Sequence, residues 1–119
     1  MNEIWIEPVY KSLFTDGSTA TGDGPVIQLD GRYATAIVQV ASTGIQAMKG
    51  SVDGTNYANL ACLNLTSGVG VLTSTGSGIF SVSVLGMKKF KANITTASSS
   101  GAYINTMIVP VMNTQIVVT

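Results

Sequence analysis

The sequence contains no histidine and only one cysteine. Histidine is the usual general base and the commonest zinc ligand, so its absence removes the Ser-His and Cys-His pairs on which many hydrolases depend. The lone Cys62 cannot form an internal disulfide, and its apolar neighbours Ala61 and Leu63 favour a buried thiol. No phosphate loop, dinucleotide fingerprint or cysteine cluster is present. We therefore expect no cofactor, no metal and no enzymatic activity.

Charged residues are also scarce. They make up 10% of the chain, against roughly a quarter in an ordinary soluble domain, while hydrophobic residues make up 45%. Six basic residues balance six acidic ones, so no net charge steers the chain toward nucleic acid. The cluster Lys88, Lys89 and Lys91 lacks the interleaved aromatic side chains that stack bases, and we expect a solvated strand face there. We expect no nucleic-acid partner, and apolar surface that further copies of the chain would cover.

Long hydrophobic runs are missing as well. No apolar run approaches the roughly 20 residues that a membrane-spanning helix needs. Residues 1–8 lack the basic start and the long apolar stretch of a secretion signal. We therefore expect a protein that folds in the cytoplasm and makes no membrane contact.

The residues that are abundant, chiefly threonine, valine, serine and glycine, favour β-strands and turns. Residues 78–85 and 89–95 alternate apolar and polar side chains, which predicts strands with one buried face. Residues 34–41 and 102–111 are apolar on both faces, which favours central strands covered on both sides or lying against a neighbouring subunit. Weaker strands are expected at residues 8–14, 26–29, 45–52, 59–63, 69–73 and 115–118.

Four Asp-Gly pairs, at residues 16–17, 23–24, 30–31 and 53–54, favour tight turns between these segments. Many short strands with frequent turns predict an all-β domain, an antiparallel β-sandwich or jelly roll of roughly eight to ten strands, with a barrel as an alternative. We expect residues 15–25 to form the longest loop. The predicted division is an N-terminal arm at residues 1–14 and a β-sandwich domain at residues 15–119.

Apolar side chains gather at both ends of the chain. The arm carries a large apolar load for a terminus that would otherwise fray, and we expect it to dock on its own body or on a partner. The C-terminal residues lack the charge that usually protects an edge strand, and pairing within an oligomer would cover them. The candidate protein-interface residues are Ile4, Trp5, Ile6, Val9, Tyr10, Phe14, Ile116, Val117 and Val118.

Residues 50–60 contain a strand, an Asp-Gly corner and an aromatic residue that re-enters the sheet. In its setting this segment resembles small tailed-bacteriophage virion structural proteins of the capsid decoration or cement type. Both show, in the same order, a Thr-Ala-Thr-Gly start, an alternating strand, a Gly-Ser-x-Asp-Gly-Thr-Asn-aromatic corner, a Gly/Ser/Thr stretch, a Phe-x-Val-x-Val-x-Gly strand and a Ser/Gly turn. In this chain these features are residues 19–22, 34–41, 50–57, 68–78, 80–86 and 98–101.

The resemblance implies a non-enzymatic β-sandwich on the capsid surface of the virion, assembled in the cytoplasm of the bacterial host. Its partners would be the major capsid protein and further copies of itself, as a homo-oligomer with a trimer favoured. The alternatives are a tail, connector or head-fibre subunit, or a glycan-binding β-sandwich module. Tyr57 and Tyr103 are the candidate aromatic platforms of such a module.

Overall fold

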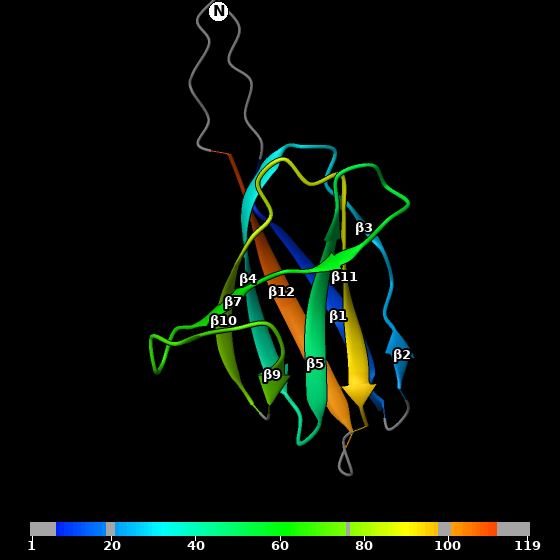
Figure 1. Ribbon diagram of the computed structural model, residues 1–119, viewed down its shortest axis with the longest axis vertical. Helices are drawn as coiled ribbons and strands as arrows, with labels where there is room; N and C mark the ends of the chain where they lie inside the picture. The colour runs from blue at the N-terminus through cyan, green and yellow to red at the C-terminus, as the bar shows by residue number, and fades with distance from the viewer. Residues whose placement is uncertain (1–6, 19–20, 76, 98–100, 112–119) are drawn as a thin grey trace, which may run out of the picture.

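The computed structural model describes residues 7–18, 21–75, 77–97 and 101–111. Within these ranges the chain contains no helix and forms two antiparallel sheets (Figure 1). Side chains from both sheets share one core, so the architecture is a β-sandwich. The predicted all-β fold class is confirmed.

Sheet A has the strand order β1-β12-β4-β10-β7-β8, and sheet B has the order β2-β11-β5-β6. The strands of sheet A are β1 (Val9–Ser18), β12 (Ala102–Pro110), β4 (Tyr33–Ala41), β10 (Gly78–Ser83), β7 (Cys62–Asn64) and β8 (Gly70–Val71). Those of sheet B are β2 (Gly22–Asp23), β11 (Lys89–Thr96), β5 (Ile45–Ser51) and β6 (Ala58–Asn59). In addition, β3 (Ile27–Gln28) pairs with β11, and β9 (Ser74–Thr75) pairs with β5. The described residues thus hold twelve strands, more than the sequence suggested, because five of them have only two residues.

Each of the clearest sequence patterns corresponds to a strand of six residues or more. Residues 34–41 and 102–111 match β4 and β12, and the alternating segments at 78–85 and 89–95 match β10 and β11. β4 pairs with β12 on one side and with β10 on the other, so it is the central strand that its apolar pattern predicts. On β11, every second side chain from Phe90 to Ile94 is buried, because successive residues of a strand point to opposite faces.

The core lies between the two sheets. Phe90 and Met48 from sheet B share it with Val38, Val82 and Ile104 from sheet A. Each of these side chains is almost completely buried, and burying one of this size contributes about 1.5–3 kcal/mol relative to leaving it exposed. The core therefore joins the sheets through residues far apart in the sequence.

Polar side chains inside the sandwich have partners. The Gln46 amide donates to the Ser42 hydroxyl, and Thr106 Oγ1 donates to the carbonyl oxygen of Ile37 at 3.1 Å. Within the described ranges, no buried side-chain nitrogen or oxygen lacks a hydrogen-bond partner. The described part of the interior therefore carries no unpaired polar side chain of the kind that can mark a functional site.

The N-terminal part of the chain departs from expectation. Residues 15–18 complete β1, and Gly22–Asp23 form β2, so the long loop expected at residues 15–25 is wrong. β1 pairs antiparallel with β12 from Val9 opposite Ile108 as far as Ser18 opposite Ala102, and the Asp-Gly pair at 16–17 lies in a register shift between Phe14 and Ser18, where it interrupts the ladder without ending the strand. The predicted arm boundary after residue 14 falls inside this edge strand of sheet A. Residues 1–6 lie outside the described residues.

The Asp30-Gly31 pair, by contrast, forms the predicted turn. Both residues have positive φ, 52° and 70°, and the Arg32 N–H donates to the Leu29 carbonyl at 3.0 Å. Positive φ at both central positions is the signature of a type I′ turn, which Asp-Gly favours. This turn takes the chain from β3, on sheet B, to β4, on sheet A.

Candidate interaction surfaces

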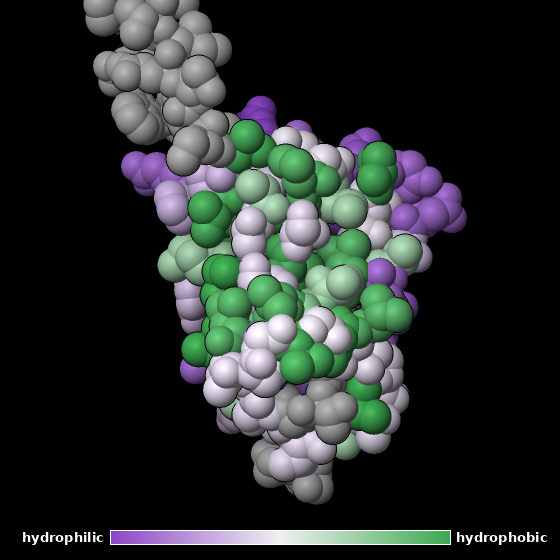
Figure 2. Space-filling view, turned by 60° about the vertical axis from the view of Figure 1, so that its left-hand side comes forward, coloured by the Kyte–Doolittle hydropathy of each residue, from purple (hydrophilic) through white to green (hydrophobic). Residues whose placement is uncertain are grey.

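The outward positions of sheet A for which a partner on a neighbouring strand is described carry no charged side chain. The inner face is fixed by the buried residues of β4, β10 and β12, and the residues between them point outward. The outward positions are Tyr10, Ser12, Thr35, Ile37, Gln39, Ala41, Leu63, Ile79, Ser81, Ser83, Tyr103, Asn105, Met107 and Val109. Figure 2 views the molecule from the edge where β10 and β7 lie, and there hydrophobic and weakly polar residues cover the middle, with the strongly hydrophilic ones mainly toward one end. Most of the outer face of sheet A lies on the far side of this view.

One row of side chains crosses five strands of this face. Tyr10 lies opposite Met107, Met107 opposite Ile37, Ile37 opposite Ser81, and Ser81 opposite Leu63. Side chains opposite one another on neighbouring strands lie about 5 Å apart, so the row is a continuous stripe. Tyr10, Met107 and Leu63 are 60%, 41% and 43% exposed. The stripe, called here the apolar row, is therefore available for contact.

An open hollow of about 190 Å³ lies along the apolar row. Its lining residues are Tyr10, Ile37, Gln39, Ile79, Asn105, Thr106 and Met107. The amides of Gln39 and Asn105 supply its polar side, and Ser12 Oγ donates to Asn105 Oδ1 at 2.8 Å. The face thus combines apolar contact area with uncharged hydrogen-bonding groups, a composition typical of protein interfaces.

The outer face of sheet B carries charge instead. Lys49 on β5 lies opposite Lys91 on β11, and Lys91 Nζ lies 2.9 Å from Asp23 Oδ2. Asn93 donates to the other carboxylate oxygen of Asp23 at 2.7 Å. The hydrogen bond from Lys91, followed by that from Asn93, lowers the pKa of Asp23 below its ordinary value. Because Asp23 is half exposed, this pair adds little to stability and serves mainly to hold β2 against β11.

The two candidate aromatic platforms differ in their surroundings. Lys91 Nζ also lies 4.0 Å from the centroid of the Tyr57 ring, which is half-buried. A cation in this position occupies one face of the ring. Tyr103 is 48% exposed and lies opposite Ala41 on the uncharged face of sheet A. The two rings therefore do not form one platform.

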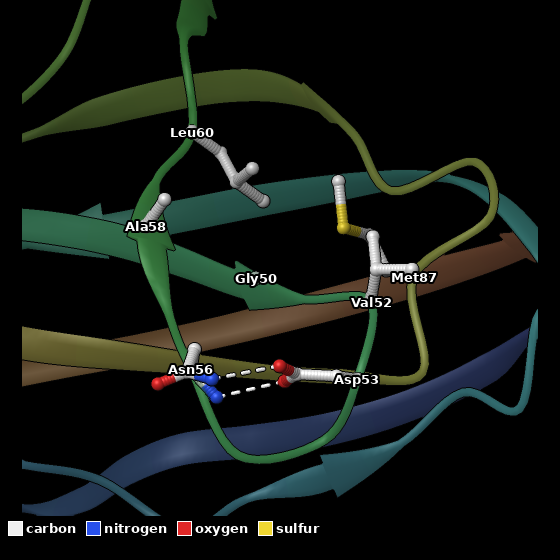
Figure 3. Close-up of a pocket in the computed structure, with 7 residues that line it drawn as sticks. All are labelled: Gly50, Val52, Asp53, Asn56, Ala58, Leu60 and Met87. Carbon is white, nitrogen blue, oxygen red and sulfur yellow. Dashed lines mark hydrogen bonds between the residues drawn. The ribbon is translucent and has the colours of Figure 1, made fainter.

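In the Asp-Gly corner after β5, residues of the same turn supply hydrogen bonds to the aspartate carboxylate. The Asp53 carboxylate accepts hydrogen bonds from the N–H groups of Asn56 and Thr55 and from the Ser51 hydroxyl, at 2.8–2.9 Å. The side-chain amide of Asn56 donates to its second oxygen at 2.8 Å (Figure 3). These bonds, led by the one from the Asn56 N–H, hold the pKa of Asp53 well below its usual range. The carboxylate thus shapes its own turn.

A second open hollow, of about 310 Å³, lies beside this corner. It is lined by Gly50, Val52, Asp53, Asn56, Ala58, Leu60 and Met87, and Figure 3 shows the side chains of all but Gly50 around it. A Cβ on Gly50 would lie 2.8 Å from Leu60 Cδ1 and 3.1 Å from Met87 Sδ. Glycine at this position therefore lets the two side chains close over β5, leaving a mostly apolar recess large enough for one side chain of a partner.

The described ranges contain few groups suited to metal binding or nucleophilic chemistry. They contain no group of three or more histidine, cysteine, aspartate or glutamate side chains placed to hold a metal ion. They also contain no helix of the length and hydropathy needed to cross a membrane. Cys62 is free and buried, and burial raises the pKa of its thiol to about 11. A thiol of that pKa stays protonated and unreactive at neutral pH.

The structure separates the predicted interface residues. On β1, Val9 is half-buried opposite Ile108, Phe14 packs against the core, and Tyr10 alone points outward into the apolar row. Ile4, Trp5, Ile6, Ile116, Val117 and Val118 lie outside the described residues, as does the strand predicted at residues 115–118. Ile37 and Met107 were not among the candidates. Their signal was the two-sided apolar pattern of β4 and β12, which indicated the strands but not which face is free.

No family model matches the sequence, and no curated protein matches it. Two solved structures share its fold. SPBc2 prophage-derived protein YomS superposes with a TM-score of 0.71 and 12% identity, covering 90% of this chain and 98% of that one. PBSX exported protein XepA superposes with a TM-score of 0.78 and 12% identity, covering 86% of this chain and 37% of that one. At such identity the likeness shows a shared β-sandwich fold.

Proposed function

We propose that this chain is a non-enzymatic structural protein of a bacteriophage particle, specifically a capsid decoration (cement) protein that binds the major capsid protein and stabilises the shell. The observation that carries the proposal is the uncharged outer face of sheet A, which spans six strands and exposes large apolar side chains. Broad apolar surface interspersed with uncharged polar groups fits burial against protein rather than capture of a small molecule.

The structural comparison supplies the phage context. The fold is shared with a prophage-derived protein over nearly the full length of both chains. The order of strand and corner motifs that resembles tailed-phage virion proteins supports the same assignment.

Stabilisation would follow from mass action. A protein that binds only the assembled shell stabilises that shell by an energy that grows with the logarithm of its free concentration over its Kd, about 2.7 kcal/mol per site at 100 times the Kd. Decoration therefore requires many equivalent sites and no catalysis. Copy number is the property that separates this role from other virion roles.

The test is the molar ratio of this protein to the major shell protein in purified particles, measured by quantitative mass spectrometry with labelled reference peptides. A ratio of about one-third to one, as regular binding to a symmetric shell requires, supports decoration. A few copies per particle overturn decoration in favour of a tail, connector or head-fibre subunit. Absence from particles overturns the virion assignment.

A further inference from the structure

We propose that the N-terminal segment of one copy, residues 1–7, binds the hollow beside the Asp53-Gly54 corner of a second copy. Trp5 fills the hollow, and the carboxylates of Glu3 and Glu7 pair with two lysines beside the corner. This contact goes beyond capsid decoration, because it joins copies of the isolated protein through a surface other than the outer face of sheet A.

The receiving site is the hollow of about 310 Å³ after β5. Leu60 and Met87 lie on opposite sides of it, and Asp53 and Asn56 lie along a third side (Figure 3). The lining is mostly apolar, and Val52 is 70% exposed at its margin. The hollow is therefore open to a partner and has room for one large side chain, and aromatic rings are the commonest anchors of this kind at protein interfaces.

Two lysines without an ion pair flank this corner. A Cβ on Gly54 would lie 3.2 Å from Lys88 Cδ and 3.5 Å from Lys89 Cε, so both side chains run past the corner. Lys88 is exposed and Lys89 is half-buried, and within the described ranges neither forms an ion pair. The Asp53 carboxylate takes its hydrogen bonds from its own turn. Carboxylates of a partner would therefore complement the charge of this corner.

The N-terminal segment carries the matching pattern. Side chains of an extended segment alternate between two faces, so Glu3, Trp5 and Glu7 share one face, with the two carboxylates about 13 Å apart along the backbone. No lysine or arginine precedes Lys11. The C-terminal residues 112–119, by contrast, carry no charged side chain. An aromatic ring between two carboxylates thus selects the N-terminal segment as the occupant of an apolar hollow beside two lysines.

The backbone before β1 favours a second copy over the same copy. A residue that precedes proline is biased toward extended conformations, so the Glu7-Pro8 pair favours a segment that continues away from β1 without turning back. β1 belongs to sheet A from Val9 onward, whereas the corner follows β5 of sheet B. Each copy then offers one segment and one hollow. Such a head-to-tail contact can close into a ring, and the trimer favoured from the sequence is one such ring.

Trp5 is the only tryptophan in the chain, so its fluorescence reports directly on the contact. We expect the full-length protein to associate between about 1 and about 500 micromolar in analytical ultracentrifugation. Over the same range the Trp5 emission should move to shorter wavelength, and both changes should weaken at high salt. A monomeric wild type would overturn the proposal. A short-wavelength emission already present in the monomer would also overturn it, because the segment would then dock on its own body.

Charge reversal tests the pairing of the two surfaces. Lys88→Glu with Lys89→Glu should raise the Kd of association at least about 10-fold, and Glu3→Lys with Glu7→Lys should do the same, because like charges then meet. Combining all four changes should restore the Kd to within about 3-fold of the wild type. Circular dichroism verifies that each variant is folded. Unchanged association of the Glu3→Lys, Glu7→Lys variant, or no recovery in the folded combination, would overturn the proposal.

A matched control separates the site from general charge effects. Lys11→Glu and Lys88→Glu each reverse one exposed lysine, but Lys11 lies on β1, away from the corner. Lys88→Glu alone should raise the Kd at least about 3-fold, and Lys11→Glu should leave it within about 2-fold. Equal effects would contradict the assignment of the site. No particle is present in these experiments, so a monomeric chain that is abundant on shells would overturn this contact and leave decoration intact.

Discussion

The ammonium nitrogen of Lys91 lies 4.0 Å from the centroid of the Tyr57 ring. The same nitrogen contacts the Asp23 carboxylate, so one lysine connects β2, β11 and the segment that precedes β6. The Lys91 side chain is only 15% exposed, because the ring and the carboxylate flank it. The aromatic residue of the Asp-Gly corner therefore packs against its own sheet.

Replacing Tyr57 with alanine should lower the free energy of unfolding by about 0.5–1 kcal/mol, because the variant loses the cation–π contact. Tyr57→Phe keeps a ring beneath the ammonium group and should lose less. Urea denaturation followed by circular dichroism measures both. A glycan array probed with the wild type should remain silent, and specific glycan binding that Tyr57→Ala abolishes would restore the alternative of a glycan-binding module.

Asp53 should make stability depend on pH in the acid range. Its pKa is lowered in the folded state, so its contribution is present in full above its unfolded value near 3.8 and is lost as the pH falls below that value. Asp53→Asn should therefore lower the melting temperature at pH 7, and the gap between variant and wild type should shrink toward pH 3. Calorimetry across this range measures the gap. A constant gap from pH 7 to pH 3 would mean that the charge of Asp53 does not matter.

At Gly24 the close approach of another backbone segment leaves no room for a side chain. A Cβ at this position would lie 2.7 Å from the carbonyl oxygen of Leu13, and the Gly24 N–H donates to the Ala92 carbonyl at 2.8 Å. Gly24→Ala should destabilise the fold by about 1–3 kcal/mol, because neither backbone segment can move freely. Gly70→Ala is the control, since its nearest neighbour lies 4.0 Å away. Equal losses in chemical denaturation would refute the steric explanation.

Cys62 should react slowly in the native protein. A thiol with a pKa of about 11 holds about 100-fold less thiolate at pH 8 than one with a pKa of 9, and the thiolate is the reacting species. Iodoacetamide labelling followed by mass spectrometry should show at least that difference between native and urea-unfolded protein. Rapid native labelling would show that β7 opens readily or that the thiol is accessible.

The sequence predicted what short-range patterns determine. Alternation located β10 and β11 and the burial of Phe90, and two-sided apolarity placed β4 at the centre of its sheet. It failed at residues 15–18, where the Asp-Gly signal marks an irregularity in the pairing of β1 with β12 and not the end of the strand. It also missed the two-residue strands, since a two-residue segment has no detectable period.

The candidate site was less predictable than the fold. The apolar row depends on which face of β4 and β12 points away from the core, and this is settled only when sheet B packs against the opposite face. Of the nine candidates taken from the chain ends, Tyr10 joins that row because β1 pairs in register with β12. Ile37 became a candidate only through that packing.

The irregular edge strand of sheet A disfavours the addition of further strands to the sheet. β1 is ten residues long, and its outer side pairs with no described strand. A regular edge of that length can template the addition of strand after strand, which leads to fibrils. The register of β1 shifts between Ser12 and Phe14 and again before Ser18, and such irregularities bend a strand out of line for a newcomer. An edge broken in this way is a poor template for a further strand, which matters in a chain with so little charge to keep its copies apart.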